Sequence, residues 1–437
     1  MPYSIIELEV TQPLPTICTS GDDTGIALVL RRKDRPIGFL MQSRPAKTVL
    51  TPEELAQLLS QEIGTKLLQE SIREELVPPA NQDQFPTLTV AICTKDRPEN
   101  VVRCLEHLLN VETPNHVLLQ KTLENPSGFE ILVVDNAPSD EQTRELIATF
   151  AGVRYVREPK AGLDFARNRA LQEATSEIIA YLDDDVTVDR QWLNGLIEAW
   201  AENPDAAAFT GLVLPYELDT EAQILFEKRG GFGRGFEKIR YGQVLPGNPL
   251  YPCGAGIFGA GCNMAFRREV LLKVGGFDEA LDTGGPLPGG GDLDIFYRVI
   301  QAGYPLVYEP KYLVFHQHRR ELAELRRQYW SWGLGFMAFV VKSYQQDPFQ
   351  RSKFRRLVGW WFKDQLYQFG MNVIGRHVLP TRMILAELWG GIVGLLGEYP
   401  RSLRRIEQIK KQFASDVALP FQQQFGCRQD DRVMLQK

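Results

Sequence analysis

Residues 178–185 read Ile-Ile-Ala-Tyr-Leu-Asp-Asp-Asp, an apolar run that ends in three adjacent aspartates. A continuous apolar run of this length is typical of a strand buried on both faces. Carboxylates crowded at the end of such a strand repel one another unless a cation lies between them. A hard divalent cation such as Mg²⁺ or Mn²⁺ prefers oxygen ligands of this kind. The alternative interpretations are a solvated acidic loop and a helix that begins near residue 185.

Strands and helices alternate on the N-terminal side of these aspartates. The pattern predicts strands at residues 88–93, 130–134 and 153–156, and helices that reach residue 109, span 140–150 and span 165–174. Apolar strands alternating with amphipathic helices predict an α/β fold with a mostly parallel sheet covered on both faces. Ligands of such sheets bind beyond the carboxyl ends of the strands. The loops that carry Asp96, Asp135 and Asp183 therefore converge at one edge of the predicted sheet.

Residues 1–85 have the pattern of a small α+β module. Apolar runs at 26–30 and 37–41 flank a charged turn and predict a β-hairpin. Thr51-Pro52-Glu53-Glu54 combines an N-cap, a proline at the first helical position and a capping-box glutamate, and predicts a helix into the early seventies. Residues 78–83 are typical of a linker. The predicted domains are this module, an α/β domain over 86–320 and a helical region over 321–437.

Two parts of the chain allow more than one interpretation. Residues 205–262 are rich in glycine and aromatic residues, which is typical of an irregular surface loop or of a mobile segment over a substrate. Residues 383–397 are apolar apart from Glu387, and arginines follow them. Such a helix can lie on a membrane surface, pack on the α/β domain or form a dimer contact. Peripheral membrane contact and a homo-oligomer therefore both stay open.

Composition limits the class of protein. The chain has 437 residues, of which 44% are hydrophobic and 24% are charged, as in a globular protein of two or three units. The net charge of −6 provides no basic stripe for nucleic acid. The six cysteines are scattered without a CxxC pair, so we expect reduced thiols and a cytoplasmic location, at the inner face of the membrane if the C-terminal helices touch it. Neither a signal peptide nor a membrane-spanning stretch is expected.

Six stretches, in this order, resemble the motifs of family-2 glycosyltransferases, which have the GT-A fold, a Rossmann-like sheet. They are residues 90–98 (VAICTKDRP), 130–136 (EILVVDN), 162–168 (GLDFARN), 181–185 (YLDDD, the DxD motif), 275–278 (GGFD) and 291–294 (GDLD). The resemblance covers roughly residues 87–320.

The resemblance implies roles for individual residues. It places eight residues around the nucleotide and sugar of a nucleotide-sugar donor. Asp184 is one of them, but the resemblance gives it no particular contact. The set is Thr94, Asp96, Arg97, Asp135, Arg167, Asn168, Asp183 and Asp184. It also implies a Mn²⁺ or Mg²⁺ ion held by Asp183, Asp185 and His316, with Asp185 as the direct ligand.

Asp292 matches the position of the family's catalytic base. A base is needed because a sugar hydroxyl is a poor nucleophile at neutral pH. The family has a glutamate before this aspartate, whereas this chain has Gly291. Asp294 is a rival, but its i+4 neighbour Arg298 predicts a helix-face ion pair instead. Arg319 and Arg320 are either diphosphate contacts or part of a solvated basic face.

These observations predict a metal-dependent, inverting glycosyltransferase that acts on a carbohydrate, a lipid-linked or a protein acceptor. A nucleotidyltransferase would be expected to carry a glycine-rich, lysine-bearing loop after the first strand, and residues 94–98 are not such a loop. The alternative is a non-catalytic, glycosyltransferase-like binding or scaffold subunit, because Gly291 interrupts a motif.

Overall fold

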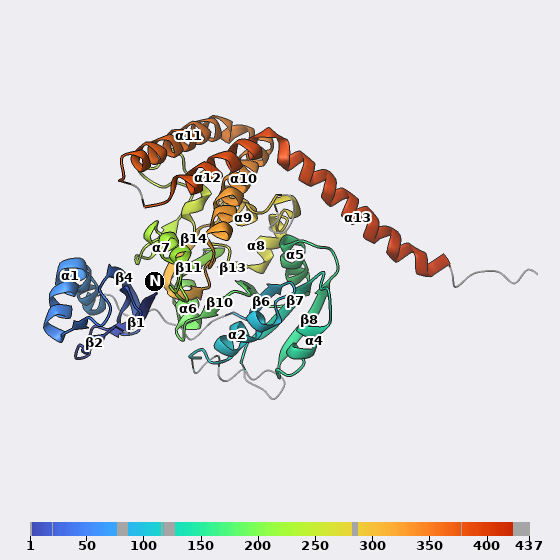
Figure 1. Cartoon of the computed structure of the whole chain (residues 1–437). Helices are drawn as coiled ribbons and strands as arrows, with labels where there is room; N and C mark the ends of the chain where they lie inside the picture. The colour runs from blue at the N-terminus through green and yellow to red at the C-terminus, as the bar shows by residue number, and fades with distance from the viewer. Residues whose placement is uncertain are drawn as a thin grey trace, which may run out of the picture.

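The computed structural model describes residues 2–19, 21–76, 86–114, 117, 127–281, 287–376 and 378–422, with side chains as far as residue 414. Figure 1 shows a small N-terminal module beside a larger domain built on one sheet, and a group of helices above that sheet. The last helix, α13, extends away from the rest of the molecule.

The N-terminal module is a three-stranded sheet covered by one helix. Strands β1 (Tyr3–Glu9), β3 (Gly25–Arg32) and β4 (Arg35–Ser43) are neighbours in that order, and β3 and β4 form the predicted antiparallel hairpin. Two short strands, β2 (Ile17–Cys18) and β5 (Val49–Leu50), pair beside it.

Helix α1 (Pro52–Leu76) begins at the predicted capping box: Glu54 N donates to Thr51 Oγ1 at 3.3 Å, and Thr51 N donates to Glu54 Oε2 at 2.9 Å. The helix ends a few residues later than predicted. The predicted linker lies outside the described residues.

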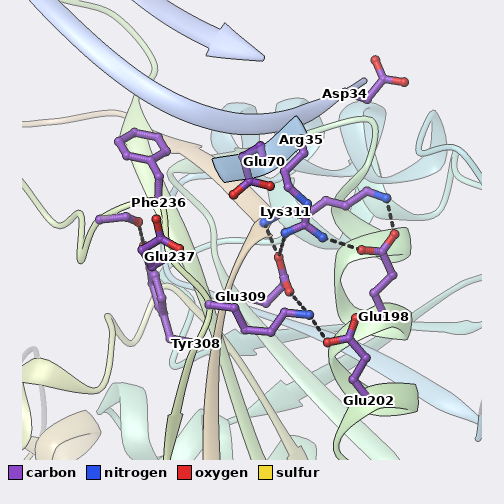
Figure 2. Close-up of polar contacts among 12 residues, drawn as sticks. Asp34, Arg35, Glu70, Glu198, Glu202, Phe236, Glu237, Tyr308, Glu309 and Lys311 are labelled. Carbon is purple, nitrogen blue, oxygen red and sulfur yellow. Dashed lines mark hydrogen bonds and ion pairs between the residues drawn. The ribbon is translucent and has the colours of Figure 1, made fainter. Parts of the chain in front are cut away.

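Buried ion pairs join this module to the larger domain. The guanidinium of Arg35 donates to Glu309 Oε1 and to Glu198 Oε2, each at 2.8 Å, as Figure 2 shows. Glu309 is fully buried, and Lys238 lies 2.7 Å from its second oxygen. Nearby, Arg31 Nη2 donates to Asp189 Oδ2 at 2.5 Å, and both residues are buried. Because a buried carboxylate is costly without a cationic partner, these pairs require the two units to stay docked.

The central sheet has nine strands. They are β6 (Leu88–Thr94), β7 (Glu130–Asn136), β8 (Val153–Glu158), β9 (Ile178–Asp183), β10 (Val186–Val188), β11 (Ala208–Pro215), β12 (Ile239–Tyr241), β13 (Asn263–Arg267) and β14 (Leu306–His316). The order is β10-β14-β11-β13-β9-β6-β7-β8, with β12 beside β14. Strands β6, β7, β8, β9, β11 and β14 run in one direction, and the other three run against them. The α/β class predicted from the sequence is confirmed.

Successive residues of the first strands feed two separate cores. Val90 and Ile92 pack on one face with α2 (Pro98–Leu109) and α6 (Trp192–Glu202). Ala91 packs on the other face, together with residues of α5 (Leu163–Glu173), α8 (Arg268–Lys273) and α9 (Gly291–Gln301). Because both faces are covered, alternate positions cannot be polar, which explains the continuous apolar runs. The short helix α4 (Gln142–Ile147) lies between β7 and β8 in the chain.

The structure excludes two of the alternative interpretations of the sequence. Residues 205–262 are not an irregular loop throughout, because β11 is buried along its whole length between β14 and β13, and α7 (Glu221–Lys228) follows it. Gly211 lets the backbone of β11 lie close to that of β14, because a Cβ at this position would lie only 1.7 Å from Tyr312 O. The chain after residue 185 forms β10, paired with β14, instead of starting a helix.

The C-terminal region is helical, as predicted. It contains α10 (Leu322–Gln346), α11 (Arg351–Val373), α12 (Thr381–Val393) and α13 (Tyr399–Gln422). A Cβ on Gly333 of α10 would lie 2.0 Å from Glu387 O of α12, so the two helices pack at backbone distance. In the part of the chain that the structure describes, no helix has both the length and the apolar character needed to cross a bilayer. The five described cysteines are all free thiols, as predicted.

Candidate active site

The three aspartates at the end of β9 point to different partners. Asp183 accepts from Arg167 Nη2 at 3.3 Å. Asp184 accepts from Thr94 Oγ1 at 2.8 Å and from Arg97 Nη1 at 3.2 Å. Successive side chains on a strand face opposite sides, so Asp183 turns toward α5 and Asp184 toward the loop after β6. Asp185, one residue beyond the pair, faces His316 at the end of β14, and its Oδ2 lies 3.7 Å from Arg97 Nη1.

Burial separates the charge states of these carboxyl groups. It raises the pKa of Asp183, and burial together with the neighbouring Asp185 raises the pKa of Asp184 to about 7. Burial also acts to raise the pKa of Asp185, but His316, Arg319 and Arg97 together outweigh it and lower that pKa. Of the three aspartates, Asp185 is therefore the one whose carboxylate is most strongly favoured in the ionised form.

A histidine pair connects Asp185 to a glutamate on α7. His316 Nε2 lies 3.4 Å from Asp185 Oδ1, and His316 Nδ1 lies 3.0 Å from His318 Nδ1. His318 Nε2 lies 2.7 Å from Glu227 Oε1. The side chains of His316, His318 and Glu227 are all buried or nearly so. Burial lowers the pKa of His316 to about 4, so its imidazole is neutral at pH 7.

The donor and acceptor capacity of each group limits where protons can lie along the contacts from Glu227 to Asp185. Glu227 can only accept, so His318 Nε2 carries a proton. If His318 is a cation, its Nδ1 donates to His316 Nδ1 and His316 Nε2 carries the proton. If His318 is neutral, its Nδ1 accepts from His316 Nδ1–H. This leaves an unprotonated Nε2 on His316, facing a carboxylate oxygen of Asp185. With this tautomer, two acceptors lie 3.4 Å apart, and a cation between them would offset their repulsion.

The loops after β6 and β7 are tied together. Asp96, whose φ of 53° is in the left-handed region, accepts from Ser139 N at 2.8 Å and from Ser139 Oγ at 2.9 Å. Asp135 is fully buried and accepts from Tyr155 OH at 2.9 Å through Oδ2, whereas its Oδ1 has no hydrogen-bond partner among the described residues. Burial raises the pKa of Asp135. A buried acceptor without a partner is the position where a ligand donor gains most.

The predicted pair on α5 has two different tasks. Arg167 is buried and donates to Asp164 Oδ1 at 3.2 Å, to Asp183 and to Gly261 O. Asn168 exchanges hydrogen bonds with both backbone groups of Phe277, at 2.8 and 2.9 Å. Arg167 therefore reaches the triplet, and Asn168 fixes the segment after Gly276 instead of facing the triplet.

Asp292 lies beside this arginine, at the first turn of α9. A Cβ built on Gly261 would lie 3.1 Å from Asp292 Cβ and 3.4 Å from Arg167 Nη2, so the three residues meet. Within the described residues, the only hydrogen bond to the Asp292 carboxylate comes from its neighbour, Leu293 N, at 2.9 Å. The second carboxylate oxygen, Oδ2, is left available. This is the state that a general base needs.

Asp294 is held in a structural cluster. It is buried, and the predicted ion pair with Arg298 is present at 2.7 Å, together with a second pair to Lys342 Nζ at 2.7 Å. Gly291 leaves space for another carboxylate, because a Cβ there would lie 2.2 Å from Asp164 Oδ2. The family has a glutamate at position 291, and in this chain the carboxylate of Asp164 from α5 lies next to that position instead.

A cavity of about 340 Å³ opens beside Asp185. Its lining includes the cationic side chains of Arg97, Arg319 and Arg320. Arg320 pairs with Glu217 and Asp219, whereas no ion pair engages Arg319 among the described residues. The lining also includes the carboxylates of Asp185, Glu321 and Glu324, which balance the three arginines. Arg97 and Arg319 are the side chains in this cavity that suit phosphate oxygens.

The structure brings most of the predicted site residues to one edge of the sheet. Asp185 and His316 are adjacent, but Asp183 turns to Arg167, and no group of three metal-ligating side chains forms among the described residues. Sequence reasoning missed Asp164, Glu227, Gly261 and the role of His318. Only the His-x-His spacing of residues 316 and 318 signalled part of this arrangement.

Residues 89–275 match the model of the family described as Glycosyl transferase family 2. The chain is 27% identical over 209 residues to a pre-mycofactocin glycosyltransferase of Mycobacterium tuberculosis, an alignment that covers 47% of this chain and 41% of the relative. It is 26% identical over 250 residues to the succinoglycan biosynthesis protein ExoM of Rhizobium meliloti, covering 55% and 71%.

Among solved structures, a mannosyltransferase from Pyrobaculum calidifontis in complex with GDP-Man and Mn²⁺ aligns over 84% of this chain and 91% of its own, at 16% identity and a TM-score of 0.44. The chain spans less than half the length of the M. tuberculosis relative. Taken with the motifs on β6, β7, β9 and α9, the family match shows that residues 89–275 of this chain form a glycosyl transferase family 2 domain.

Proposed function

We propose that the chain transfers a glycosyl group from a nucleoside-diphosphate sugar to an acceptor hydroxyl, with a divalent cation and with inversion at the anomeric carbon. One observation carries this proposal: His316 Nε2 lies 3.4 Å from Asp185 Oδ1, beside a cavity of about 340 Å³ that Arg97 and Arg319 help to line. Family membership supports the reaction class.

The donor would lie along the carboxyl edge of the sheet. Asp135 Oδ1, which is buried without a partner, would accept from the nucleobase, and Asp96 would hold the loop at Ser139 in place beside it. Arg97 and Arg319 would face the diphosphate, whose charge they match. Asp183, held by Arg167, would lie on the ribose side.

A divalent cation fits Asp185 and His316. Two ligands, each about 2.1 Å from one ion, lie roughly 3 to 3.5 Å apart, which is the spacing of Asp185 Oδ1 and His316 Nε2. When His318 is neutral and donates to Glu227, the lone pair of His316 lies on Nε2, the nitrogen that faces Asp185. An ion bound there supplies electrostatic stabilisation to the departing diphosphate. The remaining ligand positions would belong to the donor and to water, since only two protein ligands converge.

Asp292 would act as the base. Its carboxylate would accept the proton of the acceptor hydroxyl as that oxygen forms a bond to the anomeric carbon, and the bond from this carbon to the diphosphate would break on the opposite face. Arg167 keeps Asp292 and Asp183 from repelling each other, because its guanidinium lies next to both. A direct displacement needs no nucleophile from the protein.

A scaffold role is the second candidate, because Gly291 interrupts the family motif. The geometry favours catalysis over this alternative: Asp292 keeps one free carboxylate oxygen, and Asp164 fills the space next to Gly291. The proposal covers any nucleobase and sugar of the donor and any acceptor hydroxyl.

Thermal shift with a panel of nucleoside-diphosphate sugars, in Mn²⁺ and in EDTA, tests donor binding. A true donor stabilises the native state by about 2.7 kcal/mol at a hundred times its Kd. We expect one nucleotide class to raise the Tm in Mn²⁺ only. No shift with any donor in Mn²⁺ would contradict the proposal.

A further inference from the structure

Exposed apolar side chains concentrate on the C-terminal helices. Nine of the twenty large hydrophobic residues that are exposed in the described chain fall between residues 360 and 396. Five of them belong to α11 and its C-cap: Trp360, Leu366, Tyr367, Val373 and Ile374. Their exposed fractions run from 52% to 69%, so they are not edges of the core. A patch of this kind marks a surface that meets an apolar partner.

These residues share one face of α11. Trp360, Lys363, Tyr367 and Ile374 recur at three-, four- and seven-residue steps, and the opposite face buries Phe354, Leu357 and Trp361. The ring of Trp361 is held against Gly391 of α12, where an added Cβ would lie 2.3 Å from it. Figure 1 shows α11 at the outside of the helical group. The helix is therefore already anchored by one face and presents the other. We call the outward residues the α11 face: Arg355, Arg356, Trp360, Lys363, Leu366, Tyr367, Val373 and Ile374.

The α11 face carries positive charge only. Every exposed charged residue of α11 is basic, including Arg355, Arg356 and Lys363, and its one acidic residue, Asp364, is not among the exposed ones. Arg376 and Arg382 are exposed just beyond the helix. The chain as a whole has a net charge of −6, so the charge of this face is opposite in sign to that of the molecule.

We propose that the α11 face docks on a membrane surface that contains anionic lipid. Trp360 and Tyr367 combine an apolar ring with a polar group, which suits the bilayer interface. The arginines and Lys363 reach phosphate oxygens while their stems lie along apolar surface. Docking buries the helix face in the interfacial region and needs no spanning segment, in agreement with the described helices.

A second copy of the chain fits this face less well. Pairing two α11 faces would bring Arg355, Arg356 and Lys363 of one copy close to the same cations of the other, with no exposed carboxylate on the helix to offset them. Exposed apolar residues of α12, Leu385 and Trp389, extend the same chemistry to the neighbouring helix.

An apolar cavity of about 180 Å³ lies between α10 and α11, next to this face. Val341 and Tyr344 of α10 and Phe354 and Val358 of α11 line it, and Arg355 lies at its edge. The apolar lining beside an exposed arginine has the same chemistry as the α11 face.

Vesicle flotation of the full chain tests the proposal. The probes are vesicles of phosphatidylcholine and vesicles of phosphatidylcholine and phosphatidylglycerol in equal parts. We expect the wild-type protein to float with the anionic vesicles and to stay below the neutral ones, and we expect high salt to release it. Floating equally well with both would refute the role of the basic residues, and floating with neither would refute membrane docking.

Two variants separate the charge from the apolar contribution. Arg355→Glu/Arg356→Glu/Lys363→Glu should reduce partitioning into anionic vesicles by at least about tenfold, and Trp360→Ser/Leu366→Ser/Tyr367→Ser should do the same. Matched controls carry three changes of the same kind elsewhere on the surface: Lys33→Glu/Lys47→Glu/Arg144→Glu for charge, and Leu146→Ser/Val244→Ser/Leu272→Ser for apolar area. These should float like the wild-type protein.

Two further measurements keep the result interpretable. Melting temperatures within a few degrees of wild type show that the variants are folded. Sedimentation equilibrium without vesicles detects self-association, and a dimer that the α11 variants abolish would overturn the membrane proposal in favour of a second copy. None of these measurements uses a donor or an acceptor, so they are independent of the proposed transfer reaction.

Discussion

His316 Nε2 and Asp185 Oδ1 face each other across 3.4 Å, at the junction of β14 and the end of β9. Neither atom carries a proton when His318 is neutral and hydrogen-bonded to Glu227. The metal site that we propose therefore depends on the contact between His318, two residues after β14, and Glu227 of α7, which is 91 positions away in the chain.

His318→Phe should weaken Mn²⁺ binding by about 10- to 100-fold, because His316 loses the partner that fixes its tautomer and ring orientation. Phenylalanine retains the packing against Phe226 and Phe232. Isothermal titration with Mn²⁺ measures the effect, and His107→Phe, at an exposed position on α2, is the control. An unchanged Mn²⁺ dissociation constant in His318→Phe would rule out the positioning role.

Asp292→Asn should lower kcat by about 100-fold or more while leaving the donor Kd unchanged, because the amide cannot take the acceptor's proton. Donor binding is measured by calorimetry and transfer by release of nucleoside diphosphate. Asp205→Asn, at an exposed loop position, should behave like wild type. If Asp292→Asn retains full turnover, another residue is the base.

Arg35→Met should destabilise the protein by roughly 3 kcal/mol, because Glu309 remains buried after losing one of its cations. Lys238 stays in place and limits the loss. Denaturant unfolding measures it, and Arg35→Met/Glu309→Gln should recover part of the difference. Arg32→Met, whose partner Glu74 lies within the module and is partly exposed, should cost less than about 1 kcal/mol. Equal losses for Arg32 and Arg35 would contradict a buried docking interface.

Glu387 gives the stability a pH dependence. Burial raises its pKa from 4.5 to about 7. A carboxyl whose folded pKa lies above its unfolded pKa binds the proton more tightly in the folded state, so stability falls as pH rises from about 4.5 through 7.

Glu387→Gln should remove this loss. The substitution should be nearly neutral at pH 5 and should stabilise the protein by on the order of 2 kcal/mol at pH 8. Melting temperatures at the two pH values measure it, with Glu407→Gln on the exposed side of α13 as control. A stabilisation that is the same at both pH values would exclude titration of Glu387.

Local signals predicted the strand–helix alternation of residues 88–183 well, because each buried strand is one short apolar run and each helix begins at a recognisable turn. Strand β11 was missed, since its glycine is required by the approach of Tyr312, a residue distant in the chain. Contacts of that kind leave no local pattern.

The candidate site shows the same division. The positions of Asp135, Asp185 and Asp292 follow from motif order and from the topology of a parallel sheet. The carboxylate of Asp164 beside Gly291 does not, because it comes from α5, far from α9 in sequence. The missing motif glutamate suggested a damaged site, whereas the structure places another carboxylate in the same space.

Donor turnover by wild type and Asp185→Ala, in Mn²⁺ and in EDTA, shows whether glycosyl transfer depends on a cation held by Asp185. The readout is release of nucleoside diphosphate from the donor class identified by thermal shift. We expect turnover by the wild-type protein in Mn²⁺, loss of that turnover in EDTA, and no turnover by Asp185→Ala in either condition. Equal turnover by Asp185→Ala and wild type, or wild-type turnover unaffected by EDTA, would contradict this dependence.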